Sequence, residues 1–237
     1  MSINVTHAMV LAAGLGLRMR PLTLTRPKPL VEVKGKALID YSADKLAASG
    51  VGTAVVNVHY LADQLEAWAR ARLAPRMVIS VERAEILDTG GGVAKALPLL
   101  GPEPFFVLNS DSFWADGPAH ALDRLKAAWD TQRMDCLILL CALPRTVGYE
   151  GRGDFHLGAD GRLIRRRGDE SGAMAYIGGY LVHPRLFAGA PTGKFSMNLL
   201  WDRAIAEGRL HGLEHDGLWL HVGTPEAIGE AEARLAK

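Results

Sequence analysis

Two glycines and a cluster of basic side chains near the amino terminus are the residues best suited to bind phosphate. Gly14 and Gly16 flank a single leucine, and six lysines or arginines but only one acid lie between residues 18 and 36. Glycine lets backbone N–H groups approach an anion closely, and nearby cations balance its charge. Three prolines stiffen this long segment, and a loop of such length in a compact domain is usually functional. We therefore expect an ordered phosphate-binding loop.

The segment matches neither of the common glycine-rich phosphate motifs. A dinucleotide fingerprint would have a third glycine at position 19, where this chain has Met19, and an acid about 20 residues further on. A Walker loop needs Ser or Thr after Gly-Lys, but Ala37 follows Lys36. These mismatches disfavour a dinucleotide-dependent oxidoreductase and indicate another way of holding phosphate.

Two further polar segments could complete a site. Three consecutive glycines, 90–92, precede a predicted helix, where they form either an ordinary turn or a wall without side chains. Asn109, Ser110 and Asp111 directly follow an apolar run. An aspartate at the carboxyl end of a strand can hold Mg²⁺ shared with phosphate oxygens, although an Asx turn or a helix N-cap is the alternative.

Alternating strands and helices must position these segments. Such alternation predicts an α/β fold: a Rossmann-like, doubly wound, mostly parallel sheet with helices on both faces. Ligands bind at the carboxyl ends of the strands of such sheets, so residues 14–36 and 109–114 should share one edge. The predicted strands span 8–13, 53–58, 77–81 and 105–108, and the predicted helices span 38–49, 61–72 and 93–100.

The second half of the chain has a different pattern. Residues 148–193 hold 11 of the 26 glycines, which predicts a small, irregular and partly antiparallel β-rich subregion. Helices are predicted at 197–207 and 225–236, with a strand at 218–222 between them. Because no linker is visible, we expect a single domain, 1–237, whose two halves meet near residue 115.

Composition excludes several classes of protein. The 237 residues include 27 basic and 26 acidic side chains, a net charge of +1 that argues against nucleic-acid or membrane binding by the whole protein. No apolar run reaches the roughly 20 residues of a membrane span, and no signal peptide is visible. Cys136 and Cys141 indicate neither a disulfide framework nor a zinc site. We expect a cytoplasmic protein, as a monomer or homodimer.

The run from Leu11 to Val31 resembles the N-terminal signature of the sugar-1-phosphate nucleotidylyltransferases. It reads Leu-Ala-Ala-Gly-Leu-Gly-Leu-Arg-Met-Arg-Pro-Leu-Thr and, shortly after, Arg-Pro-Lys-Pro-Leu-Val. The resemblance implies transfer of a nucleoside monophosphate from a nucleoside triphosphate to a sugar 1-phosphate, with release of pyrophosphate. It also implies that Arg18 contacts the β- and γ-phosphates, that Lys28 stabilises the reacting α-phosphate, and that Mg²⁺ is the cofactor.

The same resemblance implies further site residues. It gives residues 1–115 to the nucleotide and 116–237 to the sugar phosphate, so the β-rich subregion would bind the sugar. Asp111 would be a metal ligand. The remaining nucleotide-binding residues would be Leu11, Ala13, Gly14, Gly16, Glu85 and Gly90, and the sugar-phosphate-binding residues would be Asn109, Gly153, Asp154 and Gly179.

One position departs from the family pattern. The family commonly has Trp-x-Asp-x-Gly-Thr, whose aspartate is a second metal ligand, but this chain has His221 in that place. Mg²⁺ prefers oxygen ligands. Asp111 and the phosphates could hold the metal alone, Asn198 or Asp216 could supply another oxygen, or a softer ion such as Mn²⁺ could be favoured with His221 as its ligand.

The Gly151-Arg-Gly-Asp-Phe155 element and the short chain are most similar to the N-acetylmuramate-1-phosphate uridylyltransferases of peptidoglycan recycling. The expected substrates are therefore UTP and N-acetylmuramate 1-phosphate. Mannose-1-phosphate guanylyltransferase, or another sugar or phosphocholine nucleotidylyltransferase, is the alternative. A catalytically silent regulatory protein that binds a nucleotide sugar is a more distant one.

Overall fold

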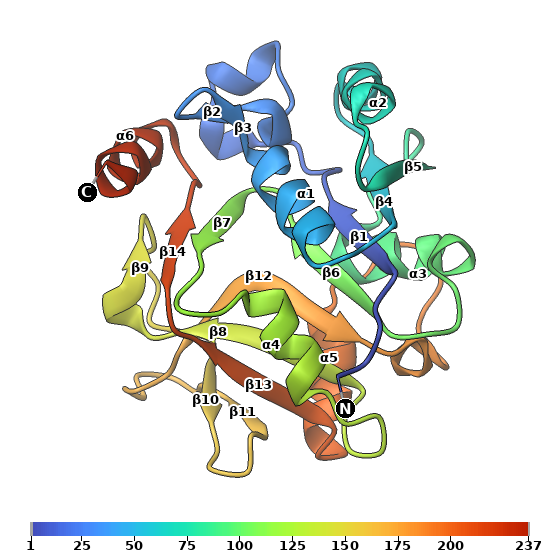
Figure 1. Ribbon diagram of the computed structural model, residues 1–237, viewed down its shortest axis with the longest axis vertical. Coiled ribbons are helices and arrows are strands. Elements are labelled where there is room, and N and C mark those ends of the chain that lie inside the picture. Colours follow the sequence, from blue (N-terminus) through green and yellow to red (C-terminus); the bar gives the residue numbers. More distant parts are fainter. Residues whose placement is uncertain (1, 237) are drawn as a thin grey trace.

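A seven-stranded sheet in the order β13-β8-β12-β6-β1-β4-β5 forms the centre of the computed structural model, which describes residues 2–236 (Figure 1). Met1 and Lys237, the ends of the predicted domain, lie outside the described residues. Neighbouring strands pair in parallel, except that β12 is antiparallel to both β6 and β8. The sheet is thus mostly parallel, as predicted. Its strands are β1 (His7–Leu11), β4 (Thr53–Val58), β5 (Arg76–Val81), β6 (Phe105–Asn109), β8 (Cys136–Cys141), β12 (Ala175–Val182) and β13 (Leu210–His215).

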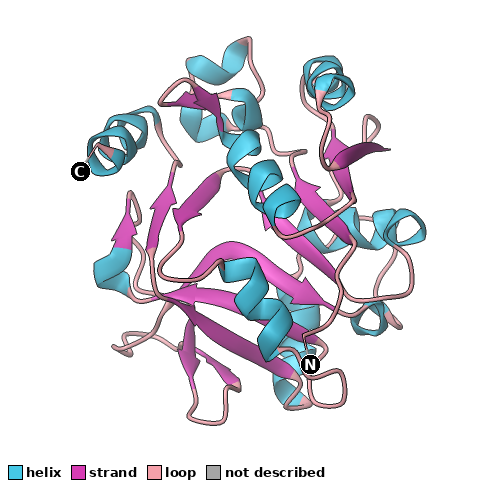
Figure 2. Ribbon diagram, viewed as in Figure 1, coloured by secondary structure: helices cyan, strands magenta, loops and turns pink. Residues whose placement is uncertain are grey.

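Helices cover both faces of this sheet, which confirms the doubly wound arrangement (Figure 2). Successive side chains of a strand point to opposite faces. Phe106 therefore packs in the cluster that includes residues of α1, α2 and α4, while Phe105 packs with α3 and α5. The helices are α1 (Leu38–Ala48), α2 (Ala62–Ala71), α3 (Asp88–Leu100), α4 (Ala121–Ala128), α5 (Asn198–Ala206) and α6 (Pro225–Leu235).

The predicted elements lie within two residues of the observed ones, with one exception. The helix predicted at 93–100 begins at Asp88, so the three glycines lie inside the helix and not in a turn before it. Glycine disfavours a helix, which is why the sequence prediction was wrong here. The segment around Phe195 compensates, because its carbonyl oxygen accepts hydrogen bonds from the N–H groups of both Gly90 and Gly91, each 3.0 Å long.

The second half of the chain adds small strands around the main sheet. An antiparallel hairpin, β10 (Phe155–Leu157) and β11 (Leu163–Arg165), lies in the irregular region that the sequence predicted. A three-stranded sheet joins β7 (Ser112–Ala115), β14 (Leu218–His221) and β9 (Thr146–Val147), with α6 beside it (Figure 1). The sequence analysis did not predict β7, β13 or α4.

The loop after β1 is ordered by short elements of its own. It contains three 3₁₀ turns, Leu17–Met19, Leu22–Leu24 and Lys28–Leu30, followed by the hairpin of β2 (Glu32–Val33) and β3 (Lys36–Ala37). Met19, Val31 and Val33 are buried in a third apolar cluster together with residues of β14 and α6. The prediction of an ordered loop is confirmed. Among residues 2–236, no helix has the length and apolar character needed to span a membrane.

Candidate active site

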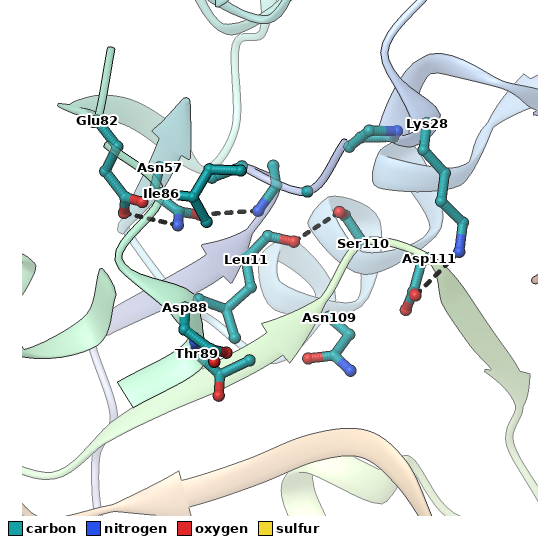
Figure 3. A pocket seen from close by; sticks show the side chains of 14 residues that line it. Leu11, Lys28, Asn57, Glu82, Ile86, Asp88, Thr89, Asn109, Ser110 and Asp111 are labelled. Carbon is teal, nitrogen blue, oxygen red and sulfur yellow. Dashed lines mark hydrogen bonds and ion pairs between the residues drawn. The ribbon is translucent and has the colours of Figure 1, made fainter. Parts of the chain in front are cut away.

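The first cavity, of about 240 Å³, lies where β1 and β6 end (Figure 3). Residues 11–14, which include the last residue of β1, line one side, and residues 109–111, which include the last residue of β6, line another. Lys28 reaches the same cavity from its 3₁₀ turn. The expectation that the loop after β1 and the polar segment after β6 share one edge is therefore confirmed.

An ion pair between Lys28 and Asp111 joins these two segments. Lys28 Nζ lies 3.0 Å from Asp111 Oδ2, and the two side chains are 11% and 33% exposed. Burial on its own would raise the pKa of the Asp111 carboxyl, but the charge and hydrogen bond of Lys28, together with the charge of Arg18, outweigh it and hold that pKa below its usual value. Asp111 is therefore ionised at neutral pH.

The two loop glycines have different surroundings. Gly14 lines the first cavity, and a Cβ added there would meet no atom within 4 Å. Gly16 does not line the cavity; its φ is +62°, and a Cβ there would lie 3.0 Å from the Cβ of Lys28. Its carbonyl accepts a 2.7 Å hydrogen bond from Thr23 Oγ1. Gly16 thus lets the loop fold back against Lys28, while Gly14 leaves the cavity open.

A buried amide–carboxylate pair, which the sequence analysis missed, braces the opposite wall of the first cavity (Figure 3). Asn57 Oδ1 accepts from the N–H of Ala12 at 2.8 Å, and Asn57 Nδ2 donates to Glu82 Oε1 at 2.8 Å. Glu82 Oε2 accepts from the N–H of Leu87 at 3.1 Å, so the chain links the end of β1 to the start of α3. Asn57 and Glu82 are only 3% and 2% exposed. A lone asparagine in the otherwise apolar end of β4 was the sequence signal for this pair.

The other predicted nucleotide residues divide into two groups. Leu11 and Ala13 line the first cavity, as expected for contacts there. Glu85 is exposed and does not line the cavity. The acid that lines the cavity in this segment is Glu82. Gly90 is buried and also outside the lining, because the ring of Phe195 occupies the space where a Cβ would be.

The start of α3 forms a wall shared with a second cavity of about 270 Å³. Asp88 and Thr89 line both cavities, together with Leu11 and Asn109. Asp88 has a φ of +61°, which is uncommon for a residue other than glycine, and its carboxylate accepts from the N–H of Thr89 at 2.6 Å. The Thr89 hydroxyl accepts from the N–H of Met197 at 2.9 Å and so ties this wall to the segment before α5.

The second cavity contains two of the residues predicted to bind the sugar phosphate, Asn109 and Asp154. Asp154 Oδ2 accepts a 2.8 Å hydrogen bond from the N–H of Tyr176. The preceding residue, Gly153, has a φ of +85°, and a Cβ there would lie only 2.7 Å from the carbonyl oxygen of Ala173. Glycine therefore allows the main chain to approach Ala173 closely just before Asp154. Gly179 lies outside the lining, and a Cβ there would meet the core side chains Trp114, Leu108 and Leu139. Arg165 and Trp201 also line this cavity and were not identified from the sequence, and Asn198, considered there only as a metal ligand, lines it too.

Arg18 and His221 line a third cavity, of about 650 Å³, and both are close enough to Asp111 to affect its pKa. Strand β14 ends at His221 opposite Ser112, and the N–H of Val222 donates to the carbonyl of Asp111 at 3.3 Å. Burial lowers the pKa of His221, and the charges of Lys28 and Arg18 lower it further against the opposite effect of Asp111. The imidazole is therefore neutral at neutral pH and has a lone pair available.

The residues near Asp111 fit a hard metal ion that takes most of its ligands from elsewhere. Mg²⁺ is usually bound by one or two carboxylates together with substrate phosphates and water. Asp111 supplies one ionised carboxylate, and no cluster of three or more His, Cys, Asp or Glu ligands occurs within residues 2–236. Asp216 precedes β14 at the end away from His221 and pairs with Arg124, so it is not at this site. Asn198 lines the second cavity instead.

Comparison with known proteins shows the family of this chain. The model of the nucleotidyl transferase family matches residues 7–149. The N-acetylmuramate alpha-1-phosphate uridylyltransferase of Caulobacter vibrioides is 51% identical over 234 residues, which cover 97% of each chain. The enzyme of that name from Neisseria meningitidis is 33% identical over 229 residues, 95% of this chain and 96% of the relative. The inositol-1-phosphate CTP transferase from T. maritima shares the fold, with a TM-score of 0.78, 18% identity and 97% coverage of both chains.

Proposed function

The chain belongs to the nucleotidyl transferase family, and on that premise we propose that it transfers a uridylyl group from UTP to N-acetylmuramate 1-phosphate. The products are UDP-N-acetylmuramate and pyrophosphate. The observation that carries the proposal is the meeting of the first and second cavities at one shared wall, beside the Lys28–Asp111 pair. Two phosphorylated substrates bound in the two cavities would bring their phosphates together at that wall.

The chemistry requires little from the protein besides positioning and charge. A phosphate oxygen of the sugar 1-phosphate attacks the α-phosphorus of UTP, and the bond from that phosphorus to the β-phosphate oxygen breaks. The attacking phosphate is already an anion at neutral pH, so no side chain needs to remove a proton. Holding the reacting groups in line and neutralising their charge accounts for most catalysis in reactions of this kind.

Lys28 is the residue that we assign to the reacting phosphate. Among the described residues that line the first cavity it is the one cation, and its side chain is only 11% exposed. A buried ammonium interacts with developing negative charge more strongly than an exposed one, because water screens it less. Arg18 lines the third cavity and lies close enough to Asp111 to lower its pKa, and we assign it to the outer phosphates of the triphosphate.

Asp111 is the residue that would hold Mg²⁺. An ion held there would supply positive charge against the phosphates and the departing pyrophosphate. His221 adds a neutral nitrogen beside that carboxylate, a ligand better matched to Mn²⁺ than to Mg²⁺. The protein therefore offers a metal ion one charged oxygen ligand, from Asp111, and one neutral nitrogen ligand, from His221.

The second cavity is where we place the sugar 1-phosphate, with Asn109 and Asp154 as its polar contacts. In this assignment residues 1–115 form the nucleotide half of a single domain and residues 116–237 its sugar half. Muramate is a cell-wall sugar, which supports a role in cytoplasmic peptidoglycan recycling.

A substrate panel tests the proposal. Pyrophosphate release is measured with UTP, GTP and CTP, each paired with N-acetylmuramate 1-phosphate, N-acetylglucosamine 1-phosphate, mannose 1-phosphate and phosphocholine, with Mg²⁺ or Mn²⁺. We expect the highest kcat/KM for UTP with N-acetylmuramate 1-phosphate. A higher value for GTP with mannose 1-phosphate would instead identify a guanylyltransferase. Nucleotide-sugar binding without pyrophosphate release from any pair would indicate a regulatory protein.

A further inference from the structure

Arg165 is the one cation among the described residues that line the second cavity, and the chemistry above gives it no role. It is the last residue of β11 and pairs with Phe155 across the β10–β11 hairpin. Its side chain is 33% exposed, so a ligand in the cavity can reach it.

Three neighbours hold the guanidinium of Arg165 in one orientation. Its Nε donates to Asp202 Oδ1 at 2.6 Å, and its Nη2 donates to Asn198 Oδ1 at 3.2 Å. Asn198 and Asp202 are four residues apart on α5, so they lie on the same face of the helix. The guanidinium carbon lies 4.8 Å from the centre of the Phe155 ring, within the range of a cation–π contact.

The guanidinium of Arg165 keeps N–H donors that its contacts with α5 do not use. Arginine has five N–H bonds, and the contacts to Asp202 and Asn198 use two of them, which leaves both hydrogens of Nη1 and one of Nη2. This pair of nitrogens matches the two oxygens of a carboxylate. Two acids, Asp88 and Asp154, line the same cavity, so a ligand carboxylate would be repelled there unless a cation received it.

We propose that Arg165 binds a carboxylate attached to the sugar ring and thereby selects a sugar acid over the corresponding neutral sugar. The inference rests on the proposed function, because muramate is glucosamine bearing a lactyl ether whose carboxylate is ionised at neutral pH. N-acetylglucosamine 1-phosphate has the same ring, acetamido group and phosphate but lacks that carboxylate. The two sugar phosphates therefore separate recognition of the carboxylate from recognition of everything else.

The test compares Arg165→Met with wild type on these two sugar phosphates at saturating UTP. N-acetylglucosamine 1-phosphate serves as substrate or, where its turnover is too slow, as a competitive inhibitor. We expect KM for N-acetylmuramate 1-phosphate to rise about 10- to 100-fold, the loss typical of a charge-assisted contact. The KM or Ki of N-acetylglucosamine 1-phosphate and the KM of UTP should change less than about twofold.

Two companion variants guard against a purely structural effect. Arg167→Met removes the same charge two residues away, from an exposed side chain outside the cavity lining, and should leave all three constants unchanged. Arg165→Lys can still pair with Asp202 and so keeps the hairpin attached to α5, but it lacks the fork and should lose part of the discrimination.

The outcomes separate this inference from the proposed function. Equal losses on both sugar phosphates would show that Arg165 binds the phosphate or only supports the hairpin, and would overturn the inference. Unchanged constants for Arg165→Met in an enzyme that prefers N-acetylmuramate 1-phosphate would overturn it as well, while leaving the proposed function intact. A wild-type protein that does not use N-acetylmuramate 1-phosphate would overturn both.

Discussion

The first and second cavities share a wall, but the chain builds them in different ways. The first lies at the ends of two neighbouring parallel strands, and hydrogen bonds to the main chain help to fix several of its polar side chains: Ser110 Oγ donates to the carbonyl of Leu11 at 2.6 Å, and Asn57 accepts from Ala12. The second is assembled from a hairpin, the antiparallel strand β12 and helix α5, and side-chain pairs such as Arg165–Asp202 hold these pieces together.

This difference shows which part of the molecule is free to change its ligand. A site made from strand ends and main-chain contacts depends on the sheet itself, and few substitutions leave it intact. A site made from side chains on loops and a hairpin can be altered one residue at a time. We therefore expect substitutions in the first cavity to remove activity and substitutions in the second to redirect it.

The largest expected effect comes from Lys28→Ala in the first cavity. Loss of the buried ammonium should lower kcat about 10²- to 10³-fold, as removal of one transition-state donor typically does, and should raise KM much less. Steady-state kinetics with both substrates measure this. Arg26→Ala is the matched control: Arg26 is exposed, pairs with Glu32 and lies outside the cavity lining. Near-normal turnover by Lys28→Ala would remove Lys28 from the reaction.

The next largest effect is expected for Asp111→Asn, as an increase in the Mg²⁺ concentration that the enzyme needs. The amide keeps the shape of the side chain but removes the charge that attracts a divalent cation. The Mg²⁺ concentration for half-maximal activity should rise about 10- to 100-fold, in line with the loss of one charge-assisted contact. A titration of activity against Mg²⁺ at saturating substrates measures the shift. An unaltered midpoint would mean that another group holds the ion.

The contribution of the wall shared by the two cavities to folding is tested with Gly91→Ala, which should lower the free energy of unfolding. A Cβ at Gly91 would overlap the carbonyl oxygen of Gly193, and overpacking of this kind costs about 1–3 kcal/mol in the free energy of unfolding. Gly229→Ala, in α6, meets no atom within 4 Å and should be neutral or stabilise by up to about 1 kcal/mol. Denaturant-induced unfolding of both variants and the wild type measures these differences in the free energy of unfolding. Equal stabilities would show that the contact between α3 and residues 193–195 contributes nothing.

The smallest effect is expected for His221→Asp, at the edge of the third cavity. A second carboxylate beside Asp111 should lower the Mg²⁺ concentration for half-maximal activity about three- to tenfold, because Mg²⁺ prefers oxygen to nitrogen ligands. The same titration with Mn²⁺ should show a smaller change. If the Mg²⁺ and Mn²⁺ curves both stay as in wild type, His221 is not a metal ligand.

The sequence predicted the first cavity well because local signals define it. Apolar runs predict β1, β4 and β6. Because ligands bind at the carboxyl ends of such strands, the sequence predicts that the segments containing Lys28 and Asp111 share one edge of the sheet, where the two residues form an ion pair. The buried Asn57–Glu82 pair was missed because, although Asn57 stands out in an apolar strand, its partner lies 25 residues away, just after the neighbouring strand β5, and no local pattern links the two.

The second cavity was predicted poorly because its parts meet only through long-range contacts. Arg165 and Asp202 are 37 residues apart, and neither stands in a recognisable motif. The first turns of α3 were missed for a related reason: glycine has low helix propensity, and the stabilising partner, Phe195, lies about 100 residues further along the chain. Asp154 was found only because a family motif contains it.

The ion pair between Lys28 and Asp111 also has a thermodynamic consequence. A phosphate that takes over the Lys28 ammonium leaves a partly buried carboxylate without its counter-charge, and a cation that takes over the carboxylate leaves the ammonium alone. When both arrive, neither charge is left uncompensated. Binding of the anion and of the cation should therefore be heterotropically cooperative, and reciprocity requires each to raise the affinity of the other by the same factor.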